Sequence, residues 1–175
     1  TIGLSAIAVA KAYGARKVIA SARYPHQAEA ARKMGADIVV GSEAGAFEAA
    51  CLDATDGHGA DFVAESVGGN QTISFTQAIK ATRNQGTMLY LAAIRSPMPV
   101  DLLEPMLREI RMQSVICYGV IDGHHDFEVA IDLLESGDIP YSDIVTHQVE
   151  LENIQEGFDL AGDKTSGSIK VHVNI

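Results

Sequence analysis

Cysteine, long apolar runs and basic residues are all scarce in this sequence of 175 residues. Its two cysteines, Cys51 and Cys117, form no C-x-x-C spacing. We interpret both as interior thiols, the first in a helix and the second in a buried strand. No segment approaches the roughly 20 apolar residues of a membrane span, and no basic start followed by an apolar run suggests a signal peptide. These absences predict a cytoplasmic protein that does not act at a membrane.

The shortage of basic residues bears on partners. Thirteen Lys and Arg stand against 23 Asp and Glu, and the formal net charge of −10 is spread along the chain. Nucleic acid and anionic membranes are therefore not expected as partners. An anionic cofactor is still compatible, because a bound phosphate responds to local N–H groups and one or two cations.

The sequence has the composition of an ordinary folded domain, with 47% hydrophobic and 21% charged residues. Short apolar runs alternate with helical patterns of about ten residues, which predicts an α/β fold with a doubly wound parallel sheet. Helices are expected at 2–13, 26–34, 46–54, 72–82, 102–111, 127–135 and 151–161, and strands at 17–21, 37–40, 61–65, 87–92, 114–118, 144–149 and 168–173.

The opening T-I-G-L places Gly3 in the first turn of a helix that precedes a strand. In a complete G-x-G-x-x-G fingerprint Gly3 would be the third glycine, and the first two would lie before Thr1. We therefore expect that Thr1 is not the natural start. The alternative is a packing glycine without a ligand.

A second motif, S-A-R, ends the strand at 17–21, about twenty residues after Gly3. Dinucleotide-binding folds contact the adenosine ribose at this position, and sites specific for NAD have a carboxylate there that accepts hydrogen bonds from the ribose hydroxyls. Ala22 supplies none, whereas Arg23 with Ser21 could hold the 2′-phosphate of NADP. A solvated surface arginine is the alternative.

Two neighbouring strands end in small residues. D-F-V-A-E-S-V-G-G covers 61–69 and G-T-M-L-Y-L-A-A covers 86–93. Small residues at adjacent strand ends let a ligand approach the backbone, so the pattern predicts a crevice at the carboxyl edge of the sheet. Simple turn chemistry would also explain each one.

Together with G-A-R-K-V-I-A, G-A-D and the closing G-S-I-K-V, these motifs resemble the zinc-type alcohol dehydrogenase family of the medium-chain dehydrogenase/reductase superfamily. The resemblance covers the whole chain and corresponds to the C-terminal, cofactor-binding portion of that family. It implies a Rossmann-like domain at 1–143, without its first, central strand, and a segment at 144–175 that returns toward a catalytic domain absent here. Loss of a central strand predicts a chain of marginal stability by itself.

The resemblance also implies roles for individual residues. It places pyrophosphate contacts on Ile2, Gly3 and Lys170, adenine and ribose contacts on Ser66, Val67 and Gly68, and nicotinamide contacts on Leu91, Ala92, Ala93, Ile116 and Tyr118. Lys170 suits its role, since a lone lysine between apolar neighbours in a strand needs either an anion or solvent.

Zinc is expected only in the missing N-terminal domain, where the family binds it through Cys, His and often Glu. We interpret His124 and His125 as loop residues, because adjacent residues rarely ligate one metal. No catalytic residue is assigned within this chain.

The implied reaction of the complete enzyme is hydride transfer between NADP(H), or NAD(H), and a small alcohol or carbonyl. Alone, the chain is expected to be inactive. Two alternatives stay open: a zinc-independent quinone or enoyl reductase of the same superfamily, and a catalytically silent nucleotide-binding fragment. By analogy, a homodimer through the edge strand at 114–118 is expected.

Overall fold

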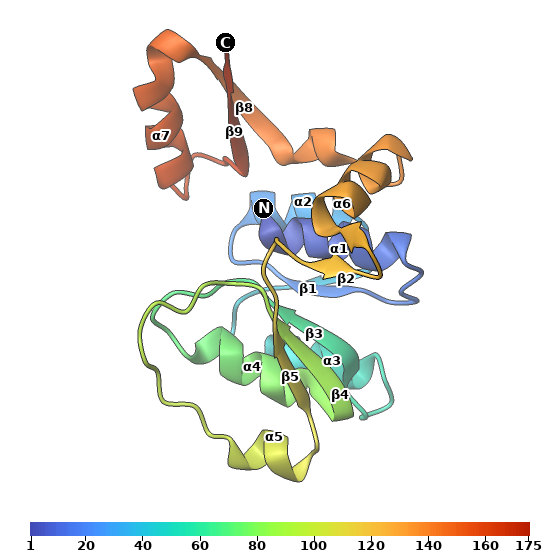
Figure 1. Cartoon of the computed structure of the whole chain (residues 1–175). Helices are drawn as coiled ribbons and strands as arrows, with labels where there is room; N and C mark the ends of the chain where they lie inside the picture. Colours follow the sequence, from blue (N-terminus) through green and yellow to red (C-terminus); the bar gives the residue numbers. More distant parts are fainter. The chain divides into compact units, whose positions relative to one another are not determined.

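The computed structural model describes residues 1–120 and 122–175 in full, and Ile121 by its backbone alone. The chain forms two compact units (Figure 1). The first combines Thr1, residues 3–41 and residues 133–175, and the second combines Ile2 with residues 42–132.

The first unit opens with two helices and two short parallel strands: α1 (Ile2–Ala12), β1 (Ile19–Ser21), α2 (Pro25–Lys33) and β2 (Ile38–Val40). Pro25 starts α2 because its fixed φ suits the first helical turn, where no N–H is needed. The core of this unit combines small and apolar side chains of the two helices, of the turn after α2 and of a segment near the C-terminus, namely Ile7, Ala8, Ala31, Met34, Ala36 and Ile144.

The C-terminal part of this unit adds a second parallel pair, β8 (Val145–Glu150) and β9 (Lys170–Asn174). The helix α7 (Ile154–Gly162) packs against both strands. The 3-10 turns η1 (Tyr141–Ile144) and η2 (Leu151–Asn153) complete this part. The helix α6 (Asp126–Glu135) belongs to the second unit up to Asp132 and to the first unit from Leu133 onward.

The second unit is a three-stranded parallel sheet in the order β3-β4-β5, with α3 and α4 beside it (Figure 1). Its elements are α3 (Ala46–Asp53), β3 (Ala60–Glu65), α4 (Ile73–Ala81), β4 (Thr82–Tyr90), α5 (Leu103–Leu107) and β5 (Arg111–Ser114), followed by the hairpin β6 (Val120–Ile121) and β7 (His124–His125). Val63, Phe75, Ile79 and Met88 are buried between the sheet and its helices.

The predicted α/β class with parallel pairing is confirmed. The strands β1 and β2 form one parallel pair, and β3, β4 and β5 form a separate parallel sheet in that order.

Two predictions around β5 were wrong. The helix expected at 102–111 ends at Leu107, because the chain then turns through Glu109 with φ 52, a left-handed conformation that a helix does not contain. The strand consequently falls on Arg111–Ser114 and not on 114–118. Cys117, which we expected in a buried strand, is exposed, whereas Cys51 is buried in α3 as predicted.

His124 and His125 do not lie in a loop as predicted but form β7, which pairs with β6 in an antiparallel hairpin. Asp122 and Gly123 make the turn, with φ values of 53 and 83. An Asp-Gly turn with two positive φ values is the type I′ geometry that two-residue hairpins favour.

No helix in the part of the chain that the structure describes combines the length and the apolar character that crossing a membrane requires.

Candidate functional site

The start of α1 lies close to the start of β9. The hydroxyl of Thr1 donates to the carbonyl of Ile169 at 3.1 Å. Lys170 and Lys164 lie near enough to the main-chain nitrogen of Thr1 for their charges to act on it, which places both lysines near the first turn. That turn contains no acidic residue, and its first N–H groups have no partner within the helix. Free N–H groups beside two cations form a setting suited to an anion.

Ser21 and Arg23 are exposed at the carboxyl end of β1. The N–H of Ala22 between them donates to the carbonyl of Val40 at 2.9 Å, which ties this end of β1 to β2. The guanidinium carbon of Arg23 lies 5.7 Å from the centre of the Tyr24 ring. None of the ion pairs found among the described side chains includes Arg23, so its charge is available to an anion.

The loop after β3 is organised by Glu65, whose side chain is only 4% exposed. Its Oε1 accepts hydrogen bonds from the N–H groups of Val67 at 3.0 Å and Gly68 at 3.1 Å, and from the hydroxyl of Ser74 at 2.7 Å. The loop residues Ser66, Val67 and Gly68 are therefore fixed from the protein interior.

Gly68 joins this loop to the end of β4. It is buried and has φ +61, and a Cβ there would lie 2.7 Å from Cβ of Ala92 and 2.9 Å from the carbonyl oxygen of Ala93. The N–H of Gly69 donates to that carbonyl at 3.2 Å, and the N–H of Leu91 donates to the carbonyl of Glu65 at 2.8 Å. The structure thus places 66–68 directly against 91–93, at the carboxyl ends of two parallel strands.

Ile116 and Tyr118 lie in the segment after β5 and are 74% and 69% exposed. Within the described part of the chain, no hydrogen bond joins them to the loops at 66–69 or 91–93. Ile2, at the first position of α1, is 52% exposed.

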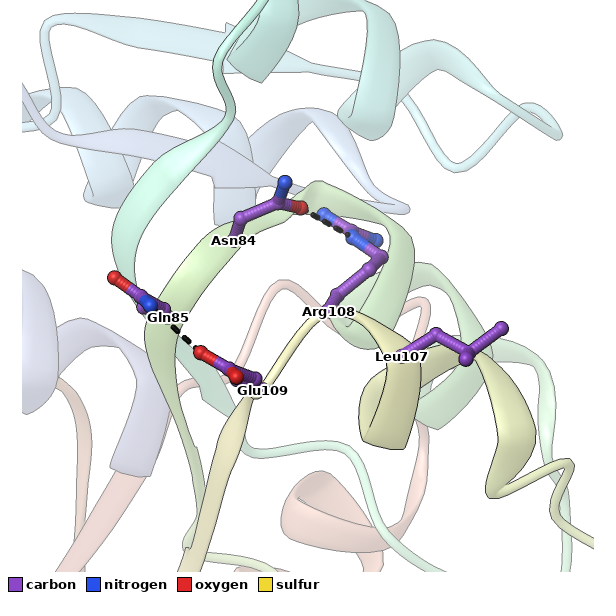
Figure 2. A pocket seen from close by; sticks show the side chains of 5 residues that line it. All are labelled: Asn84, Gln85, Leu107, Arg108 and Glu109. Atoms are coloured by element: carbon purple, nitrogen blue, oxygen red, sulfur yellow. Dashed lines mark hydrogen bonds between the residues drawn. The ribbon is translucent and has the colours of Figure 1, made fainter.

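A hollow of about 320 Å³ lies at the opposite, amino end of β4 (Figure 2). It is lined by Asn84, Gln85, Leu107, Arg108 and Glu109. Its polar side chains already bond to one another, Arg108 to Asn84 at 3.1 Å and Gln85 to Glu109 at 2.6 Å. This hollow is not part of the candidate site, because ligands of open α/β sheets bind at the carboxyl ends of the strands.

The described side chains contain no group of three or more His, Cys, Asp or Glu residues that could hold a metal ion. No chemical step is therefore assigned to zinc at the described residues.

Reasoning from the sequence missed Glu65 and Lys164. Alternation along β3 places Glu65 on the same face as the buried Val63, and a carboxylate on a buried face needs hydrogen-bond donors. That pattern could have identified Glu65. Lys164 lies in a loop, where the sequence offers no comparable signal.

Residues 1–136 match the model of a protein family described as zinc-binding dehydrogenase. An alcohol dehydrogenase from Cupriavidus necator is 30% identical over 98% of this chain, and an L-threonine 3-dehydrogenase from Bacillus velezensis is 32% identical over 96%. The chain spans about half the length of these relatives, 46% and 47% respectively.

A solved structure of 2R,3R-butanediol dehydrogenase from Bacillus subtilis is 25% identical and superposes with a TM-score of 0.83 over 99% of this chain and 48% of that protein. The likeness confirms the predicted Rossmann-like fold. With the family match over most of its length, the chain belongs to the zinc-binding dehydrogenase family, and it corresponds to about half of its relatives.

Proposed function

We propose that this chain is the cofactor-binding part of a dehydrogenase that transfers a hydride between NADP(H) and a small alcohol or carbonyl substrate. The observation that carries the proposal is the junction at Gly68. Two parallel strands end there in backbone so closely packed that not even a methyl group fits. Such a junction leaves backbone at the carboxyl edge of the sheet, where this fold class binds dinucleotides.

The anionic centre of the cofactor would lie at the start of α1. Ile2 and Gly3 would offer their backbone to the pyrophosphate, and Lys170 would supply a positive charge. The nearness of Lys170 to Thr1 supports this arrangement, as does the absence of acidic residues in the first turn. A helix N-terminus with an adjacent cation is well suited to phosphate.

The adenosine end would be recognised by Ser21 and Arg23, which favour NADP over NAD. Arg23, which is in none of the ion pairs among the described side chains, can make charge-assisted hydrogen bonds to a 2′-phosphate. Ala22 contributes no carboxylate that would repel this phosphate. Ser66, Val67 and Gly68 would contact adenine and ribose, and Leu91, Ala92, Ala93, Ile116 and Tyr118 would contact nicotinamide.

When bound, the cofactor supplies the hydride donor or acceptor, and this chain binds and orients it. Recognition of the substrate and polarisation of its oxygen by zinc would belong to a part of the protein outside this chain. The relatives bear the names alcohol dehydrogenase and L-threonine 3-dehydrogenase, which supports a small hydroxylated substrate. Residues 144–175 would lead toward that second part, and a second copy would pair at the sheet edge formed by β5.

The cofactor choice is tested by Arg23→Ala in the protein that carries this chain. Hydrogen bonds to a charged group are worth about 1.5 to 3 kcal/mol. Calorimetric titration should therefore show NADP⁺ binding weakened about tenfold to a hundredfold, with NAD⁺ binding almost unchanged. Arg16→Ala is the matched control, because Arg16 is also exposed but precedes β1. Equal losses for the two cofactors would show that Arg23 does not recognise the 2′-phosphate.

A further inference from the structure

Glu65 is a buried carboxylate that uses only one of its two oxygens. Oε1 accepts the three hydrogen bonds from Val67, Gly68 and Ser74, whereas Oε2 is buried and has no partner among the described residues. A carboxylate that acted through its charge would be expected to hold donors on both oxygens. Glu65 therefore acts as a single, multiply bonded acceptor.

The neighbouring side chains complete a closed network around the loop. Gln71 donates through Nε2 to the carbonyl of Gly68 at 3.1 Å and to the hydroxyl of Ser74 at 2.7 Å, and its Oε1 accepts from the N–H of Ser74 at 3.2 Å. The N–H and the carbonyl of Gly68 are thus both held by side chains. Together with the bonds to Oε1 of Glu65, these hydrogen bonds hold the loop in the conformation that the structure shows.

The same residue reaches the neighbouring strand end through its backbone. The carbonyl of Glu65 accepts from the N–H of Leu91, and the loop that its side chain holds bonds to Ala93 through Gly69. Both strand ends assigned to the cofactor therefore depend on the position of Glu65. It does not itself reach the site surface, since it is 4% exposed.

We propose that Glu65 is a positioning residue for cofactor binding, which presents the backbone of 66–69 in the geometry that the dinucleotide requires. This inference rests on the function proposed above. Because the role needs an acceptor and not a charge, glutamine should replace Glu65, while methionine, of similar shape but without a strong acceptor, should not.

The test is fluorescence titration of NADPH against the protein that carries this chain. Glu65→Met leaves the N–H groups of Val67 and Gly68 without an acceptor and should weaken binding about tenfold to a hundredfold. Glu65→Gln should stay within about threefold of the wild type. The matched control is Ile79→Val in α4, which removes one buried methylene away from the loop and should lower the melting temperature without changing NADPH affinity.

A second readout separates this role from a general loss of stability. Amide hydrogen exchange at Val67 and Gly68 in the absence of cofactor should be slow in the wild type and in Glu65→Gln, and fast in Glu65→Met. If Glu65→Met does not fold, Ser74→Ala, which removes one of the three bonds, should weaken NADPH binding about threefold.

The outcomes distinguish the two proposals. The positioning role alone is overturned if the wild type binds NADPH and Glu65→Met binds it with the same affinity. If Glu65→Met does not fold, the same result for Ser74→Ala overturns it. A Glu65→Gln variant as weak as Glu65→Met overturns the acceptor role in favour of charge. A wild type that binds no nicotinamide dinucleotide overturns the proposed function and this inference with it.

Discussion

Adding one methyl group at Gly68 should damage the site more than adding it at the adjacent glycine. Gly68 has φ +61, and a side chain in left-handed backbone costs about 1 to 2 kcal/mol. The new Cβ would also lie 2.7 Å from Cβ of Ala92 and 2.9 Å from the carbonyl oxygen of Ala93, and such overpacking costs about 1 to 3 kcal/mol. Gly68→Ala should therefore lower the free energy of unfolding by roughly 2 to 5 kcal/mol.

Gly69→Ala provides the comparison. Gly69 has φ +80, but a Cβ there meets nothing within 4 Å, so only the backbone cost of about 1 to 2 kcal/mol applies. Urea unfolding followed by circular dichroism gives both values, and NADPH titration should show a larger loss of affinity for Gly68→Ala. Equal losses of stability in the two variants would refute the inference that 66–68 and 91–93 are in direct contact.

Two further predictions concern titrating groups. Two hydrogen bonds lower the pKa of Asp37 below its ordinary value: the larger effect comes from the N–H of Val18 and the smaller from Lys11. The ionised Asp37 therefore stabilises the fold at pH values above the ordinary pKa, and this stabilisation is lost as the pH falls through the lowered pKa. Because Asp37 is exposed, this stabilisation should not exceed about 1 kcal/mol. Between pH 7 and pH 3 the midpoint of urea unfolding should fall less steeply in Asp37→Asn than in the wild type. Equal slopes of midpoint against pH in the two proteins would contradict this role. Burial, helped by the negative charge of Glu48, raises the pKa of the Cys51 thiol to about 11, so iodoacetamide at neutral pH should label the exposed Cys117 and leave Cys51 unmodified in the folded protein, as peptide mass spectrometry can show. Labelling of Cys51 at a similar rate would contradict its burial.

Most of the helices and strands could be predicted from local sequence patterns. The apolar runs at β1, β2 and β3 and the helical periodicity of α1, α2 and α4 each have one dominant interpretation, and the structure agrees to within a few residues. The chain around β5 is different, because Arg111–Ser114 is a mostly polar edge strand that pairs with β4. The more apolar stretch after it, including Ile116, resembles a strand by composition but is exposed.

Glycine and small residues predicted that the chain comes close to other groups at the ends of β3 and β4. The structure shows such an approach between 66–68 and 91–93, whereas the predicted binding of a ligand in a crevice there stays a prediction. Long side chains were harder to place. The nearness of Lys164 to α1 depends on contacts between segments more than 150 residues apart, and no local pattern encodes such a contact.

Hydrogen–deuterium exchange of the protein that carries this chain, with and without saturating NADPH, tests most directly whether the chain binds a nicotinamide dinucleotide at these strand ends. The account predicts that NADPH slows exchange in the first turn of α1 and in the peptides that contain 66–69 and 91–93, and leaves the hollow at Asn84 and Arg108 unchanged. Absence of any NADPH-dependent protection, or protection confined to other segments, would contradict it.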